Sequence, residues 1–255
     1  MTTEQVIDIL WSSIQAGDHF PQALQGKLTL DDAYRVQLGI LARRVASGER
    51  QSGWKVAMSG EALRQARGLD EPVFAYLLES GHYTSGQTLN YRDILNPAIE
   101  SELCITVGRR LQGPGVTRQQ ALDAVSKLEP AFELVSLRGN MAADMALGLA
   151  DGVAQWGYVT GDAISPYPKE LVLADVTAEI RRSGDVEAQV RSADVLDDQL
   201  DSVAWLANAL ARYDLALEAG HCVMTGSFTR PISINQGDQW HTQFSSVGRV
   251  TASFV

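Results

Sequence analysis

The stretch from Pro97 to Val107, PAIESELCITV, decides the fold of this chain. Its β-branched residues and its alternation predict a strand. Because residues two apart in a strand share a face, Glu100 and Glu102 project together, with Ile99 and Leu103 on the opposite face. Two carboxylates this close repel each other and raise each other's pKa unless a cation lies between them. Hard oxygen ligands of this kind suit Mg²⁺, Mn²⁺ or Ca²⁺, whereas a solvated strand face is the alternative interpretation.

A second strand follows in AFELVSL, residues 131–137, where Glu133 is the only acid in an apolar run. An unpaired buried carboxylate is costly, so this glutamate needs a partner. A third metal ligand supplied from a neighbouring strand explains both Glu133 and the paired acids upstream. A buried ion pair with an arginine is the other explanation.

Upstream of both strands, Lys55 is a lone charge in the apolar run GWKVAM, residues 53–58, which predicts a short buried strand. A partly buried lysine can have a lowered pKa and can then move protons or bind a carboxylate. The alternative is a lysine whose stem lies along a strand edge while its ammonium group reaches water.

The rest of the chain predicts a helical N-terminal region, residues 1–52, followed by a strand-dominated α+β body, residues 53–255. Apolar residues at helical spacing indicate two helices in the first part, and Thr29 is the expected N-cap of the second. In the body we expect a helix from Thr117 to about residue 128, which Pro130 ends. We also expect a strand over 171–181 and a helix over 197–212.

Composition excludes several classes of function. The 255 residues carry a net charge of −10 and no long basic run, which argues against nucleic acid and anionic membranes as partners. No apolar run approaches the roughly 18 residues of a membrane helix, and the opening MTTEQVIDILWSSIQ does not resemble a signal peptide. The two cysteines, Cys104 and Cys222, make a disulfide framework improbable. We therefore expect a cytoplasmic protein.

Other catalytic motifs are missing. The four histidines show no ligand spacing, and neither a nucleophile elbow nor a phosphate-binding glycine loop is present. Ser227, in the segment TGSFT, has no histidine and acid marked as its partners.

Several motifs together resemble the 2-keto-4-pentenoate hydratase and 4-oxalocrotonate decarboxylase family, within the fumarylacetoacetate hydrolase superfamily. The resemblance spans nearly the whole chain, and the tail from Leu206 looks most like the 2-oxohept-4-ene-1,7-dioate hydratases. The motifs that carry it are Gly53-Trp54-Lys55, the P-x-x-E-x-E-L run from Pro97 to Leu103, Pro130 to Val135, Val203 to Asn208, Gly226 to Pro231 and Gly237-Asp238.

This resemblance implies a rolled mixed β-sheet with N-terminal helices packed on it, and a homo-oligomer. It implies Mg²⁺ or Mn²⁺ held by the three glutamates and acting as a Lewis acid on a small 2-oxo acid. Lys55 would bind the substrate carboxylate or move protons. Asp151, Ser227 and Phe228 match family positions expected to lie against the substrate.

The chain also departs from the family pattern. Val73 follows Pro72 where hydratases usually have an acid, and Gly152 and Ala154 replace the asparagine and serine of an A-D-N-A-S run. The L-G-H-P element before the late helix is replaced by Leu196 to Gln199. These changes put ordinary water addition in doubt.

Three hypotheses follow from these observations. The first is a metal-dependent hydratase, which the tail favours. The second is a decarboxylase, or a repurposed isomerase or cyclase on a related carbonyl substrate, which Val73 and Ala154 favour. The third is a non-catalytic partner subunit, against which the three intact glutamates argue.

Overall fold

A computed structural model describes residues 1–255, and its N-terminal region contains the two expected helices. Helix α1 covers Thr3–Gln15 and helix α2 covers Leu30–Ala46. Both begin with a capping box, in which the N-cap threonine and the side chain three residues later satisfy each other's backbone N–H groups. The N-cap predicted at Thr29 is therefore confirmed.

The remaining helices are short except for α7. They are α3 Glu61–Ala66, α4 Arg118–Ala124, α5 Met145–Ala150, α6 Ser192–Val195 and α7 Gln199–Ala211, with 3₁₀ turns η1 Gln22–Leu24, η2 Glu79–Gly81, η3 Tyr91–Asp93 and η4 Leu173–Asp175.

The strands form one mixed sheet of eight and a second sheet of five. The larger sheet has the order β2-β1-β10-β5-β6-β7-β3, and β11 also pairs with β5. Its strands are β1 Gln51–Ala57, β2 Val73–Leu78, β3 His82–Thr84, β5 Pro97–Val107, β6 Val125–Ser136, β7 Gln155–Thr160, β10 Cys222–Ser227 and β11 Ile232–Ser233. The smaller has the order β4-β13-β12-β8-β9, from β4 Thr88–Leu89, β8 Thr177–Arg182, β9 Asp185–Arg191, β12 Gln239–Phe244 and β13 Gly248–Phe254.

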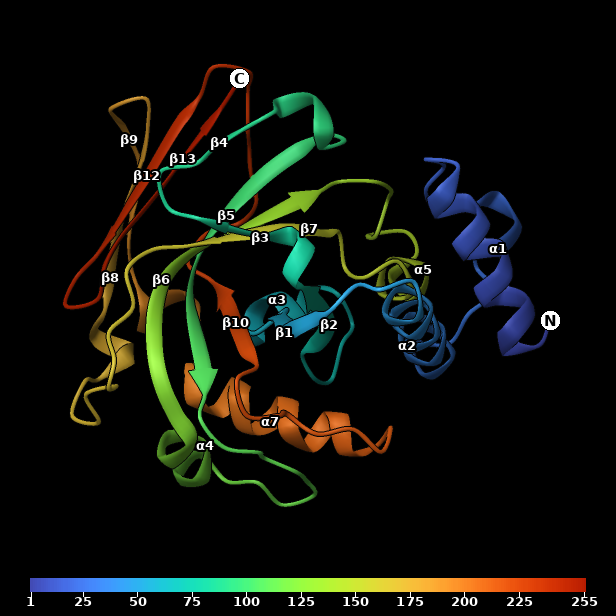
Figure 1. Ribbon diagram of the computed structural model, residues 1–255, viewed down its shortest axis with the longest axis horizontal. Helices are drawn as coiled ribbons and strands as arrows, with labels where there is room; N and C mark the ends of the chain where they lie inside the picture. The colour runs from blue at the N-terminus through green and yellow to red at the C-terminus, as the bar shows by residue number, and fades with distance from the viewer.

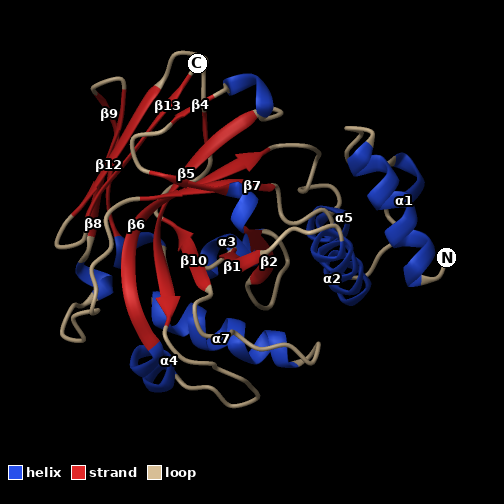
Figure 2. Cartoon of the chain, viewed as in Figure 1, coloured by secondary structure: helices blue, strands red, loops and turns tan.

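The larger sheet is curled, with helices and the second sheet placed around it (Figures 1 and 2). The smaller sheet lies on one side, α1, α2 and α5 lie on the opposite side, and α7 packs against β10 and α4. The two sheets meet through Ser101 of β5, whose hydroxyl lies 2.8 Å from that of Thr242 of β12. The expected α+β class and the curled mixed sheet are confirmed.

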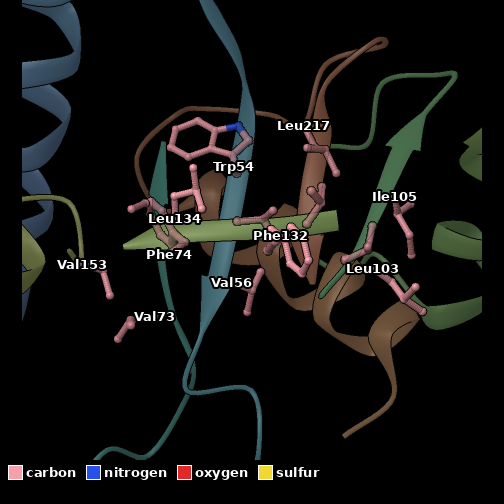
Figure 3. Close-up of a cluster of buried hydrophobic side chains, with 14 of the residues drawn as sticks. Trp54, Val56, Val73, Phe74, Leu103, Ile105, Phe132, Leu134, Val153 and Leu217 are labelled. Atoms are coloured by element: carbon pink, nitrogen blue, oxygen red, sulfur yellow. The ribbon is translucent and has the colours of Figure 1, made fainter. Parts of the chain in front are cut away.

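Helix α2 is attached to the outer face of β1 and β2 by buried aromatic rings. Phe74 stacks on Tyr34 of α2 with ring centroids 4.3 Å apart, and meets the edge of Trp54 at 5.5 Å. The buried amide of Gln37 donates to the carbonyls of Phe74 and Leu149, which links α2 to both β2 and α5. Figure 3 shows Trp54 and Phe74 within the main core.

Some local predictions were wrong. The helix at Thr117 ends at Ala124, because strand β6 begins at Val125 and contains Pro130. The strand expected over 171–181 begins only at Thr177, after the turn η4. Strands β2, β3, β4, β9 and β11 were not predicted.

The apolar face of the helical region belongs to the same core as the sheets, since Val6, Leu10 and Ile40 join one cluster with Trp54 and Ile105. The division of the chain at residue 52 stays a prediction. No helix is long and apolar enough to span a membrane.

Removing the Phe74 ring should loosen the attachment of α2. We expect Phe74→Ala to lower the free energy of unfolding by about 3–5 kcal/mol, the usual cost of deleting a fully buried aromatic ring. Leu63→Ala, at a side chain that is 39% exposed, is the control and should cost about 0.5 kcal/mol or less. Urea unfolding measures both, and equal losses would contradict the role of Phe74.

Candidate metal centre

Strand pairing brings the three predicted glutamates together. Strands β5 and β6 are antiparallel with Glu100 opposite Glu133 and Glu102 opposite Ala131, so all three side chains share one face. One oxygen from each carboxylate lies within 4.8 Å of the other two. Glu102 and Glu133 are buried, and Glu100 is partly exposed. A solvated strand face does not describe this arrangement.

Lys55 reaches the same cluster from β1 and is 2% exposed. Its Nζ donates to Oε1 of Glu133 at 2.5 Å and to the carbonyl of Val153 at 2.9 Å. The alternative of a lysine extending to water from a strand edge is therefore wrong, because β1 lies inside the sheet between β2 and β10. Glu133 does have a buried ion-pair partner, and it is this lysine rather than an arginine.

The cluster holds more negative charge than Lys55 can balance. Although the residue is partly exposed, the carboxyl group of Glu100 is enclosed, and its loss of solvation raises its pKa to about 8, with the charge of Glu133 adding to this rise. Burial also raises the pKa of Glu102 well above its ordinary value, with further increases from Glu133 and Glu100. For Glu133 burial raises the pKa as well, while the adjacent Lys55 lowers it. The chain on its own therefore favours protonated carboxyls at this site.

A divalent cation fits these groups. Three ionised carboxylates beside one ammonium group leave two negative charges in excess, which one such ion would neutralise. The ligand set is all oxygen, as Mg²⁺, Mn²⁺ and Ca²⁺ prefer. Oxygens within 4.8 Å of one another need to move only slightly to surround an ion at ordinary metal–oxygen distances of about 2.0–2.6 Å.

The turn after β10 holds Glu102 in place. The N–H of Gly226 donates to Oε2 of Glu102 at 3.0 Å. Gly226 has φ +119°, and a Cβ there would lie 2.0 Å from Oγ of Ser59, so this position requires glycine. The neighbouring Ser227 hydroxyl lies close enough to Glu100 to lower its pKa against the effect of burial.

The carbonyl that holds Lys55 comes from an unusual turn. Gly152, Val153 and Ala154 all have positive φ, at 80°, 54° and 58°. A β-branched residue such as Val153 rarely adopts this conformation, and such strain is typical of functional sites. Val153 was not identified from the sequence, since nothing in a valine side chain indicates that its backbone carbonyl accepts a hydrogen bond from a buried lysine.

Two further predicted residues lie away from the carboxylate cluster. Asp151 is buried and accepts from Nε of Arg138 at 2.7 Å. The ring of Phe228 packs edge-on against Phe244, with centroids 5.2 Å apart, in the core between the sheets. Their contact with a substrate, like that of Ser227, stays a prediction.

Comparison with known proteins identifies the family. The model for the fumarylacetoacetate (FAA) hydrolase C-terminal domain matches residues 45–255, and the chain belongs to this family. A 2-oxo-hept-4-ene-1,7-dioate hydratase from Escherichia coli is 31% identical over 236 residues, covering 90% of this chain and 88% of the relative. A 4-oxalocrotonate decarboxylase from Pseudomonas putida is 27% identical over 230 residues, covering 90% and 87%.

A solved structure resembles the whole chain. The 4-oxalocrotonate decarboxylase from Pseudomonas putida G7, complexed with magnesium and adipate, superposes with a TM-score of 0.92 at 26% identity. The match covers 100% of this chain and 99% of the other. The predicted family resemblance is confirmed, and its members include both hydratases and decarboxylases.

Glu102→Gln should separate metal binding from folding. The amide oxygen can still accept from Gly226, but the side chain can no longer ionise to bind a cation. We expect the metal-free variant to melt at the same temperature as the parent or higher, and Mg²⁺ to stop raising its Tm. For the parent, Mg²⁺ at 100 times its Kd should raise the free energy of unfolding by about 2.7 kcal/mol.

Glu129→Gln is the matched control, because Glu129 is also buried and lies on β6, outside the cluster. Its melting temperature should still rise with Mg²⁺. An undiminished Mg²⁺ response in Glu102→Gln would show that the ion binds elsewhere.

The metal-free protein should lose stability as the pH rises. The pKa of Glu100 is raised from 4.5 to about 8 in the folded chain, so folding retains a proton that the unfolded chain releases. This stabilisation is complete below about pH 4.5 and is lost as the pH rises through about 8. Urea unfolding in EDTA measures it, and Glu100→Gln should reduce the decline. Identical pH profiles for the two proteins would refute the raised pKa.

Proposed function

We propose that this protein is a divalent-metal-dependent hydratase that acts on a small 2-oxo acid of the 2-hydroxydienoate type. The observation that carries the proposal is the buried cluster of Glu100, Glu102 and Glu133 beside the ammonium group of Lys55. Relatives with this activity support it, among them the hydratase at 31% identity.

The three glutamates would hold Mg²⁺ or Mn²⁺. When bound, such an ion supplies Lewis acidity that stabilises negative charge developing on the keto oxygen of the substrate. The hydrogen bond from the N–H of Gly226 would hold Glu102 in position for the ion.

Lys55 would contact the substrate through the one N–H group of its ammonium that has no partner in the chain. Its ammonium group has three donors, of which Glu133 and the Val153 carbonyl take two. The third is free to hold the substrate carboxylate or to transfer a proton. In the reaction, the enol O–H loses its proton while the far carbon of the diene gains one, and water then adds to the conjugated enone that results.

A decarboxylase is the second candidate. One structure that matches the whole chain is that of a 4-oxalocrotonate decarboxylase, and Val73 offers no acid to activate water. Val73 is buried at the start of β2, where it pairs with Ala57. Ala75 pairs with Lys55, so Val73, two residues before it, lies on the same face of the sheet as the lysine. Loss of CO₂ needs the same stabilised enolate but no activated water, so these apolar residues are compatible with it. An isomerase or cyclase would share that requirement.

A non-catalytic partner subunit is the third candidate, and the complete glutamate set counts against it. The homo-oligomer implied by the family stays part of this proposal.

Proton NMR with a 2-hydroxydienoate in D₂O tests the function. With Mg²⁺ we expect deuterium on the far carbon of the diene when the dienol becomes the enone, and next to the keto carbon when water adds, and with EDTA we expect neither. A 2-hydroxydienedioate, which carries a second carboxylate on the far carbon of the diene, tests the alternative, and loss of CO₂ from it in place of water addition would identify the decarboxylase. If Mg²⁺ binds and no exchange occurs, the substrate class is wrong.

Lys55→Met should keep the metal and lose turnover. We expect kcat to fall by about 10²–10⁴-fold, the usual contribution of a positioned proton-transfer group, with Mg²⁺ affinity within about threefold of the parent. Lys127→Met, at a lysine that is 38% exposed, controls for the loss of one positive charge. Unchanged turnover in Lys55→Met would remove this residue from the mechanism.

A further inference from the structure

A cavity of about 400 Å³ lies on the other side of the sheet from Lys55. Arg44 of α2 and Tyr76 and Leu78 of β2 line it. Side chains alternate along β2, and Lys55 is paired with Ala75, so Tyr76 and Leu78 project from the opposite face to the lysine. None of the three glutamates lines this cavity.

Most acidic groups in the cavity wall already have partners. Asp151 accepts from Nε of Arg138 at 2.7 Å. Glu49 accepts from Nη1 of Arg44 at 2.8 Å and from the hydroxyl of Ser80 at 2.7 Å. Asp93 is exposed and accepts from Nδ2 of Asn90 at 2.8 Å. The interior therefore carries no unpaired carboxylate.

The groups that remain are mainly hydrogen-bond donors. Arg44 uses one of its five N–H groups on Glu49, and its Nε has no partner in the chain. The hydroxyl of Tyr76 lies close enough to this guanidinium for it to lower the tyrosine pKa, against a larger rise from burial. Nδ1 of His19 also lacks a partner, and it donates or accepts according to the tautomer of the ring. An excess of donors favours a ligand that accepts hydrogen bonds, and a carboxylate matches an arginine best.

The rest of the wall is apolar and partly aromatic. Ile14 and Ile40 come from the helices, and the rings of Tyr83 and Trp156 are parallel to within 5°, with centroids 5.6 Å apart. A volume of this size is in the range of small-molecule sites, which combine apolar walls with a few placed polar groups. We propose that the cavity is a second ligand site for a small organic acid with a flat apolar body. Its carboxylate would contact Arg44 and the Tyr76 hydroxyl after a small turn of the guanidinium.

Benzoate is the probe for this site, and titration calorimetry in EDTA measures its affinity without a metal to attract carboxylates. We expect saturable binding with a Kd on the order of 1 mM or below. Arg44→Gln should weaken it at least about tenfold, and Tyr76→Phe, which removes only a hydroxyl, several-fold. Arg35→Gln is the matched control, because Arg35 lies exposed on the same helix, paired with Asp31, and its loss should change nothing.

Lys55→Met separates this cavity from the metal centre, and we expect it to bind benzoate as the parent does. No saturable binding to the parent overturns the proposal. So does equal affinity in the parent, Arg44→Gln and Tyr76→Phe, or loss of binding in Lys55→Met alone. Thermal melting of each variant confirms that it is folded.

Discussion

The structure depends on an imbalance of buried charge: three carboxylates and a single ammonium group share one face of the central sheet. Ionised groups removed from water are costly unless each is paired, and Lys55 compensates only one of the three. The metal and ion-pair explanations of Glu133 are therefore not alternatives. The ion pair exists, and it leaves the charges of Glu100 and Glu102 to be balanced by protons or by a cation. The raised pKa values of these two carboxyls express the same imbalance.

The fold brings these groups together through contacts distant in sequence. The register of β5 on β6 sets Glu100 opposite Glu133, and the parallel pairing of β1 with β10 places Lys55 one strand away from β5. A shift of one residue in either register would turn an acid or the lysine to the opposite face. The aromatic contacts of Phe74 and the amide of Gln37 hold β2 and α5 against α2, and so hold the turn that binds Lys55.

What sequence could predict was local. The spacing of Glu100 and Glu102, and the isolation of Glu133 and Lys55 in apolar strands, identified the four charged groups, because a strand's period of two is visible in sequence. The Lys55–Glu133 pair was not visible, since it joins strands separated by 78 residues and depends on strand order. Helix α4 was extended too far because its apolar spacing continues into β6, where sheet pairing prevails over helix propensity. Val153 and the second cavity depend on backbone conformation and on packing between α2 and the sheet, which no single motif encodes.

The strained turn, residues 152–154, contacts groups on both faces of the larger sheet. Gly152 lines the second cavity, while the next residue, Val153, gives its carbonyl to Lys55 at the metal centre. A valine at φ +54° costs on the order of 1–3 kcal/mol, and surrounding contacts must hold it there. Those contacts include the hydrogen bond from Ser136 N–H to the Ala154 carbonyl, and the hydrogen bonds that Arg138 donates to the carboxylate and the carbonyl of Asp151. Because these partners belong to the cavity wall, the position of the lysine and the shape of the cavity are set by the same few residues. A change in this turn would therefore alter both the contact with Lys55 and the cavity wall, while Glu100, Glu102 and Glu133 keep their places on β5 and β6.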